Sequence, residues 1–228
     1  GEESRHITKS RRLHPGDCFL IQDRVGKRFE AILKSFENND ILFIPQKPVE
    51  IPPTSSLRIE ILQALPKMKA LDLILQKTTE LGVNQLDVFC GMYSPKTFRA
   101  SEKQHRLKRW QRIVSEASKQ CERQFPPEIH FHRNISNALE TLPECPNSWI
   151  LVPESANAVS WKKLTNSGDD LIKHHRLLIG PEGGFHKDEI KLSPRLGISP
   201  VYLGPRILRS ETAAITAVSI LQFLWGDL

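Results

Sequence analysis

The stretch Arg-Leu-Leu-Ile-Gly-Pro-Glu-Gly-Gly-Phe-His-Lys-Asp-Glu-Ile, residues 176–190, joins a predicted strand to a predicted helix. Residues 177–179 form a short apolar run, typical of a strand buried on both faces, and a helix is predicted for 187–192. The glycines of segment 180–184 would let a ligand approach the backbone closely. The glycine spacing fits neither a dinucleotide fingerprint nor a phosphate-binding loop, and Glu182 would repel an anion. This segment alone is explained equally well by a structural turn and by a site for a neutral or cationic ligand.

A second stretch has the same construction. Residues 203–214 read Leu-Gly-Pro-Arg-Ile-Leu-Arg-Ser-Glu-Thr-Ala-Ala, and they follow a short apolar strand and precede a predicted helix over 210–225. Ser210 is the predicted N-cap, and Glu211 complements the helix dipole. Two successive strands that end in Gly-Pro loops predict that both loops lie at one edge of one sheet.

Together these motifs resemble the SPOUT methyltransferases, and more narrowly the bacterial family that methylates N3 of a uridine in small-subunit ribosomal RNA. The resemblance implies an α/β domain with a C-terminal trefoil knot that binds S-adenosylmethionine, and a homodimer with active sites at its two-fold interface. The apolar stripe of helix 210–225 offers a surface for such a dimer, or faces the core. The residues expected to bind the cofactor are Leu151, Val152, Ile179, Gly180, Pro181, Glu182, Gly183, Leu203, Gly204, Ile207, Leu208, Thr212 and Ala213.

The chain is predicted to have two domains. Short strands at 18–22, 28–33 and 41–44 indicate a small β-barrel or sheet domain over residues 1–50, and the prolines at 45, 48, 52 and 53 predict a stiff connector. The resemblance implies a PUA-like RNA-binding domain whose first strand is expected to be absent from this chain. The residues that match the family pattern there are His6, Arg12, Pro15, Gly16 and Asp17.

The second domain is predicted to span residues 57–228. A strand at 57–65, a helix at 67–81 ending before Gly82, a strand at 86–89 and a helix at about 101–124 begin an alternation that continues to the C-terminus. This alternation predicts a mostly parallel sheet with helices on both faces.

Basic residues favour a polyanionic partner. The formal net charge is +6, and segment 103–123 holds seven basic and two acidic residues, a balance of +5. A solvated helix face is the commoner explanation of such a segment, but with the basic N-terminal cluster it suggests a track for RNA phosphates. The residues expected to bind RNA are Arg5, His6, Lys9, Arg12, Arg106, Arg109 and Arg112.

Other compositional features argue against several classes of protein. The four cysteines are scattered without a Cys-x-x-Cys pair, which indicates reduced thiols, and His130 and His132 have no further ligand nearby, so no metal site is expected. The start of the chain has no apolar segment, and no stretch is long enough to span a membrane. We therefore expect a cytoplasmic protein.

Methylation of uridine N3 requires that its proton leave. Arg123 and Arg209 are predicted to stabilise the developing uridylate, and Glu182 to offset the charge of the cofactor sulfonium. Glu116 is a candidate base, although a buried structural carboxylate paired with an arginine explains it equally well. The chain departs from the family pattern at Met92-Tyr93-Ser94, where Glu-Arg-Ser is usual, and at Lys119, where Glu is frequent.

Three functions are therefore considered. The resemblance favours methylation of small-subunit ribosomal RNA, either as free RNA or in the assembled subunit. Another RNA methyltransferase of the superfamily, acting on transfer RNA or on a ribose 2′-hydroxyl, is the second. The third is a non-catalytic RNA-binding factor of ribosome assembly, which the departures at residues 92–94 and 119 leave open.

Overall fold

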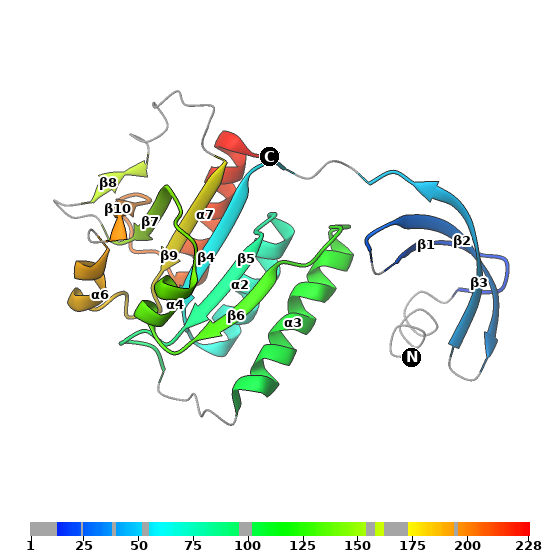
Figure 1. Ribbon diagram of the computed structural model, residues 1–228, viewed down its shortest axis with the longest axis horizontal. Coiled ribbons are helices and arrows are strands. Elements are labelled where there is room, and N and C mark those ends of the chain that lie inside the picture. Colours follow the sequence, from blue (N-terminus) through cyan, green and yellow to red (C-terminus); the bar gives the residue numbers. More distant parts are fainter. Residues whose placement is uncertain are drawn as a thin grey trace. The chain divides into compact units, whose positions relative to one another are not determined.

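The computed structural model describes residues 13–23, 25–37, 40–51, 55–95, 102–153, 158–161, 173–193 and 196–228 (Figure 1). The chain divides into two compact units, Gly1–Pro53 and Thr54–Leu228. Each unit has its own hydrophobic core.

The first unit contains a three-stranded antiparallel sheet. Strands β1 (Cys18–Gln22), β2 (Arg28–Glu37) and β3 (Asp40–Val49) lie in the order β1-β2-β3 around a small core of Phe19, Ala31 and Leu33. The third strand is longer than predicted, because Pro45 and Pro48 belong to it and not to the connector. An edge strand tolerates proline, since one side of its backbone needs no ladder partner.

The second unit is built on a seven-stranded sheet in which every strand pairing is parallel, in the order β6-β5-β4-β9-β7-β10-β8. Along the chain its elements are β4 (Arg58–Ala64), α2 (Met68–Glu80), β5 (Gln85–Phe89), α3 (Lys103–Gln120), β6 (Glu128–His132), α4 (Ile135–Thr141), β7 (Asn147–Leu151), β8 (Val159–Ser160), β9 (His174–Ile179), α6 (Lys187–Leu192), β10 (Ile198–Tyr202) and α7 (Ser210–Trp225).

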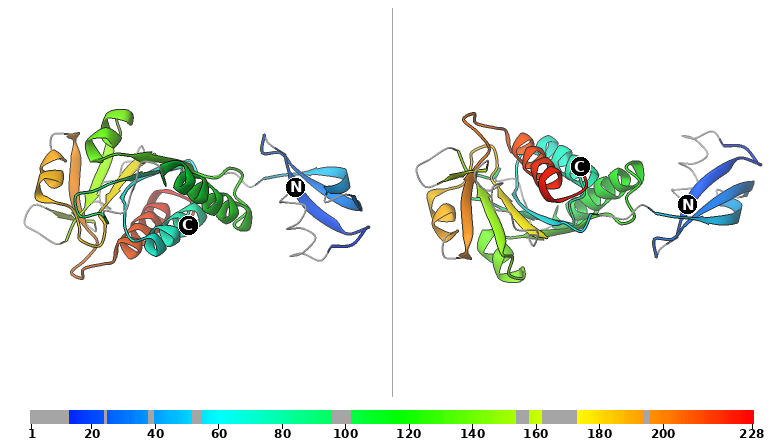
Figure 2. Two further views of the ribbon diagram at one scale, coloured as in Figure 1. Left: turned by 90° about the horizontal axis from the view of Figure 1, so that it is seen from below. Right: turned by 90° about the horizontal axis from the view of Figure 1, so that it is seen from above.

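Helices cover both faces of this sheet, as the alternating sequence pattern predicted (Figure 2). On one face α2 packs against both α3 and α7, and their apolar residues share a core with alternate residues of the strands, such as Ile59 and Ile61. On the other face α4 and α6 pack over Leu62, Ala64 and Leu178. Two cores separated by one sheet are expected for a parallel sheet, whose strands are buried on both sides.

The strand order creates a switch point between β4 and β9. Helix α2, which follows β4, and helix α6, which follows β9, lie on opposite faces of the sheet. In open parallel sheets, ligands bind outside the carboxyl ends of the strands at such a point. We therefore expect a ligand site at the loops after β4 and β9 and after the neighbouring strands.

The helix ends confirm one expectation and correct two. Gly82 lies just after the C-cap of α2 with φ +86°, as predicted. Helix α3 ends at Gln120 and not near residue 124, so it is shorter than predicted. Arg209, not Ser210, is the N-cap of α7, and the Ser210 hydroxyl is used elsewhere. Among the described residues no helix is long and apolar enough to cross a membrane.

Candidate active site at the carboxyl edge of the sheet

Three loops meet at the carboxyl edge of the sheet. They follow β9, β7 and β10, which are consecutive neighbours in the sheet, so the parallel arrangement brings the ends of all three strands together (Figure 1). The structure thereby gathers every residue expected to bind the cofactor into these loops, the adjoining strand ends and the first turn of α7. These residues are Leu151, Val152, Ile179, Gly180, Pro181, Glu182, Gly183, Leu203, Gly204, Ile207, Leu208, Thr212 and Ala213.

A hydrogen bond joins the loop after β9 directly to the start of α7. The Ser210 hydroxyl donates to the carbonyl oxygen of Gly180 at 2.6 Å. The side-chain nitrogen Nε2 of Gln63, at the end of β4, lies 3.0 Å from the Ser210 hydroxyl oxygen. It also lies 3.3 Å from the carbonyl oxygens of Ile179 and Gly180. Both side chains are almost fully buried, so their low-dielectric surroundings strengthen these bonds. The two Gly-Pro loops are therefore held as one unit.

The loop after β9, residues 180–186, is compact. The Gly184 amide donates to the Pro181 carbonyl at 2.9 Å, and Gly184 adopts φ +71°, a conformation that favours glycine. A side chain on Gly180 would lie 3.1 Å from the Gly184 backbone, so the loop closes on itself here. The turn itself therefore favours glycine at 180 and 184.

Glu182 connects this loop to helix α2. Its carboxylate accepts a hydrogen bond of 3.0 Å from the backbone amide of Lys67, the N-cap of α2. An acidic group at a helix N-terminus is stabilised by the helix dipole, and the first turn of α2 has no acidic residue of its own. In this chain Glu182 thus has a structural partner in addition to any role toward a cofactor.

The loop after β10 leaves open space beside its backbone. Gly204 has φ +141°, and a β-carbon placed on it would meet no heavy atom within 4 Å. Ile207 in the same loop is 89% exposed. Open backbone bordered by apolar side chains suits a flat nucleoside whose edges bond to backbone groups. The residues present therefore fit S-adenosylmethionine.

A turn after β5 is attached to the same edge by a buried carboxylate. Glu189 is 4% exposed, and its two oxygens accept the backbone amides of Met92, at 3.1 Å, and of His186, at 2.8 Å. Tyr93 lies in this turn, and its ring is 5.5 Å from that of His186. Sequence reasoning noted Tyr93 only as a departure from the family pattern. The signal that it missed is the parallel topology, which puts the end of β5 at this edge too.

The three candidate catalytic residues are not brought together within one chain. Arg209 is exposed at the carboxyl edge, next to Ser210. Arg123 lies before β6, at the amino edge, where its guanidinium donates to the Thr79 carbonyl near the end of α2 at 3.2 Å. Burial lowers the pKa of Arg123. Glu116 pairs with Arg112 at 3.4 Å, as one alternative had it, but it is exposed and so is not a buried structural carboxylate.

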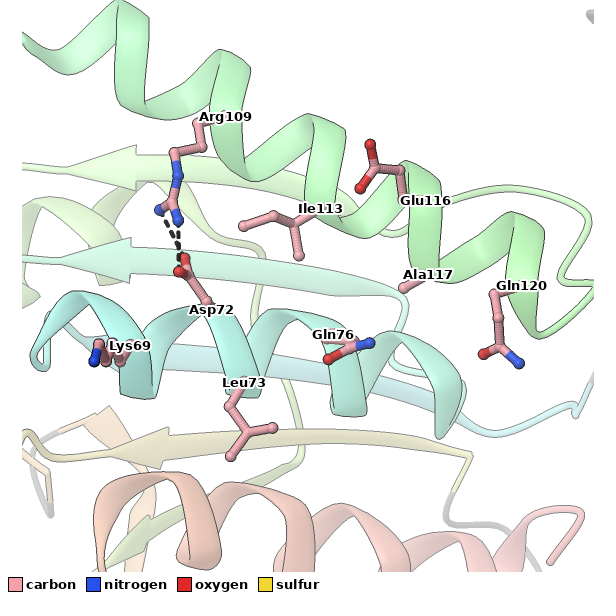
Figure 3. A pocket seen from close by; sticks show the side chains of 9 residues that line it. All are labelled: Lys69, Asp72, Leu73, Gln76, Arg109, Ile113, Glu116, Ala117 and Gln120. Carbon is pink, nitrogen blue, oxygen red and sulfur yellow. Dashed lines mark hydrogen bonds and ion pairs between the residues drawn. The ribbon is translucent and has the colours of Figure 1, made fainter. Parts of the chain in front are cut away.

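A groove of about 600 Å³ lies between α2 and α3. Arg109 and Asp72 bridge it through two hydrogen bonds of 2.7 and 2.6 Å, and Glu116 lines it from α3 (Figure 3). The bond to Asp72 raises the pKa of Arg109 against the effect of its burial. This groove is lined by residues of α2 and α3 and by no residue of the three loops.

Each predicted RNA-binding arginine on α3 has an acidic partner. Arg106 pairs with Glu102 at 2.8 Å, and Arg109 and Arg112 pair as described above. These acidic side chains thus neutralise part of the positive charge of α3. The four N-terminal candidates, Arg5, His6, Lys9 and Arg12, lie outside the described residues.

A buried ionic cluster lies at the opposite, amino edge of the sheet. Glu60 is fully buried and accepts bonds from Arg176 at 2.8 and 3.0 Å and from Arg58 at 3.0 Å. Burial opposes its ionisation, but these bonds prevail and hold the pKa of Glu60 below its ordinary value. No group of three or more potential metal ligands occurs in the described ranges.

Comparison with known sequences decides the family. Residues 53–222 match the RNA methyltransferase domain family. This chain belongs to that family. Ribosomal RNA small subunit methyltransferase E of Buchnera aphidicola (subsp. Acyrthosiphon pisum) is 30% identical to it, over 99% of this chain and 87% of the relative.

Solved structures of similar proteins include complexes with the methyl donor. A methyltransferase from Legionella pneumophila with bound S-adenosylmethionine is 29% identical, with a TM-score of 0.89 over 100% of this chain and 91% of that one. Ribosomal RNA small subunit methyltransferase E from Neisseria gonorrhoeae bound to S-adenosylmethionine is 26% identical, with a TM-score of 0.83 over the same shares. The RNA methyltransferase family thus includes structures of this fold that contain the cofactor.

Proposed function

We propose that this RNA methyltransferase uses S-adenosylmethionine to methylate N3 of a specific uridine in small-subunit ribosomal RNA. The observation that carries the proposal is the joining of two Gly-Pro loops at the carboxyl edge by the bond between Ser210 and Gly180. The names of the similar proteins support the substrate, because they act on RNA of the small ribosomal subunit.

The residues assigned to the cofactor are those of the three loops. Backbone groups of Gly180, Leu203 and Leu208 would hold the nucleoside, and Ile207 would exclude water from it. When bound, S-adenosylmethionine supplies a methyl group on a sulfonium, which is ready for in-line displacement. The task left to the chain is to align the acceptor and to make it nucleophilic.

Arg209 is the residue that we assign to the acceptor. Uridine N3 is a poor nucleophile until it loses its proton, and a cation beside N3 or O4 gains strength as that charge develops. Arg209 is exposed next to the loop that binds the cofactor in this account. A catalytic role for Arg123 or Glu116 would require a second copy of the chain, since both lie away from the three loops.

Such a second copy is part of the proposal. The apolar stripe of α7 faces the core, where Val218 and Leu221 are fully buried, so it is not the dimer surface. The opposite, outer face carries Thr212, Thr216, Ser219 and Phe223, and Phe223 is 75% exposed. A two-fold axis would place this face against itself in a homodimer. Sedimentation is expected to give a dimer at micromolar concentration, whereas a stable, active monomer would contradict this part.

Two further features of the fold follow from the resemblance. We assign residues 1–50 to a PUA-like RNA-binding domain and residues 57–228 to a SPOUT domain with a trefoil knot. The insertion of β9 between β4 and β7, both earlier in the chain, supports a threaded path. A cytoplasmic location accords with a substrate in the small ribosomal subunit.

Two measurements test the function. Calorimetry is expected to detect binding of S-adenosylmethionine, and a non-catalytic assembly factor would have no reason to bind it. Mass-spectrometric mapping of ribosomal RNA from cells that lack this protein is expected to reveal one uridine that has lost an N3-methyl group. An unchanged methylation pattern would refute the substrate.

A further inference from the structure

An exposed aromatic side chain stands beside the loop after β9. Tyr93 is 53% exposed although it lies against that loop. A β-carbon on Gly183 would come within 3.0 Å of the Tyr93 β-carbon, so Gly183 leaves room for Tyr93. The ring meets that of His186 at an interplanar angle of 70°, in an edge contact that favours this orientation of the ring.

The turn that carries Tyr93 is held on both sides. The Gly91 amide donates to the Ser94 hydroxyl at 3.0 Å, and the Ser94 amide donates to the Gly91 carbonyl at 3.1 Å. Glu189 then fastens the Met92 amide to the start of α6. Glu189 also closes the capping box of α6 by accepting the His186 amide, so one buried carboxylate joins the turn to the start of that helix.

Methylation at N3 demands an unpaired base. N3 lies on the Watson–Crick edge of uridine, so an enzyme acts on it in a single strand or takes the base out of its helix. Bases exposed in this way are held by stacking on aromatic side chains. A tyrosine ring suits this role, since it offers a large flat area and loses little conformational freedom on binding.

We propose that Tyr93 stacks on a nucleobase of the RNA substrate, next to the cofactor loops. This inference rests on the proposed function for its substrate and deepens it by naming the residue that holds the base. The location at the carboxyl edge, the rigid turn and the half-exposed ring carry it together.

Three variants test the proposal in two assays. Tyr93→Ala is expected to lower kcat/KM for small-subunit RNA, and the affinity for a short single-stranded oligouridine, by about five- to a hundredfold, the range that loss of one stacked base gives. Tyr93→Phe keeps the ring and is expected to stay within about twofold of the native protein. Met92→Ala removes an exposed side chain from the same turn, retains the amide bonded to Glu189, and is expected to behave like the native protein.

Calorimetry with S-adenosylmethionine shows whether the variants keep the cofactor site, and all three are expected to bind it as the native protein does. Equal kcat/KM and equal oligouridine affinity for Tyr93→Ala and the native protein would overturn the proposal. So would a Phe variant as impaired as the Ala variant. Should the native protein methylate no ribosomal RNA, the proposed function fails, and the oligouridine affinities alone still decide whether Tyr93 stacks on a base.

Discussion

Ser210 and Gly180 are thirty residues apart, yet the hydroxyl of one donates to the carbonyl of the other at 2.6 Å. The bond connects α7 to the end of β9 and so fixes both Gly-Pro loops relative to one another. Its geometry explains why a serine that begins a helix does not act as the cap of that helix.

Replacing Ser210 by alanine should therefore loosen the site. The Gly180 carbonyl would keep only its longer bond of 3.3 Å to Gln63, so we expect the free energy of unfolding to fall by about 0.5–1.5 kcal/mol and the affinity for S-adenosylmethionine to fall with it. Chemical denaturation and calorimetry measure the two effects. Ser115→Ala, the same change in helix α3 and outside the proposed site and dimer face, should alter neither, and equal effects of the two variants would show that the bond does not organise the site.

Gly204→Val should abolish cofactor binding without unfolding the protein. The valine would strain a backbone at φ +141° and fill the open space beside it. Gly197→Val provides the matched control, because Gly197 has φ +70°, open space around it and a location at the start of β10, away from the loops. Both variants should lose stability by about 1–3 kcal/mol. If Gly204→Val binds the cofactor as tightly as Gly197→Val does, the assignment of the pocket is wrong.

Arg209→Ala should slow the chemical step more than it weakens RNA binding. Loss of a group that stabilises developing charge raises the barrier by about 2–4 kcal/mol, and single-turnover methylation at saturating RNA and cofactor isolates that step. Arg206→Ala removes another exposed arginine of the same loop and should leave the single-turnover rate unchanged.

Arg123→Ala provides a contrast with Arg209→Ala. Its guanidinium bonds to the last turn of α2, so its loss should lower the free energy of unfolding by about 0.5–1.5 kcal/mol. If Arg209→Ala keeps the native single-turnover rate, Arg209 has no part in the chemical step. A much reduced rate in a fully stable Arg123→Ala would instead support a catalytic arginine from the partner copy.

The Glu60 cluster should make stability depend on acidity. The pKa of Glu60 is held below its ordinary value of 4.5, so its contribution is complete above that pH and is lost as the pH falls through the folded-state pKa. Glu60→Gln should flatten this dependence and should cost about 3–5 kcal/mol at neutral pH, because Arg176 keeps its buried charge without a counter-ion. Denaturation midpoints across the acid range measure both effects.

The exposed pair of Glu116 and Arg112 is the control for the cluster. Glu116→Gln is expected to lower the free energy of unfolding by less than about 1 kcal/mol at any pH, since exposed ion pairs contribute little. If Glu60→Gln keeps the acid dependence of the native protein, then another group is responsible for it.

The sequence predicted the second unit well where local patterns govern structure. Helices 187–192 and 210–225 have the predicted bounds, and the apolar runs before the Gly-Pro loops are strands of a parallel sheet. Such helices and strands are predictable because they depend on the apolar periodicity of neighbouring residues and on the glycines that interrupt it.

Local patterns do not predict contacts between residues that lie far apart in the sequence. The Ser210 hydroxyl is a good cap by local rules, and only the packing of α7 against β9 brings the Gly180 carbonyl to it. For Glu116 the sequence allowed a candidate base or a buried structural carboxylate, and its exposure on α3 rules out the second. The location of Tyr93 likewise depends on which strands are neighbours, which a single sequence does not encode locally.

The most direct test of the account is methyl transfer from isotopically labelled S-adenosylmethionine to small ribosomal subunits from cells that lack this protein. The account predicts that one methyl group enters each subunit, on N3 of a single uridine, and that Gly204→Val transfers none. Absence of labelled RNA, a label on a ribose 2′-hydroxyl, or transfer to transfer RNA alone would contradict it.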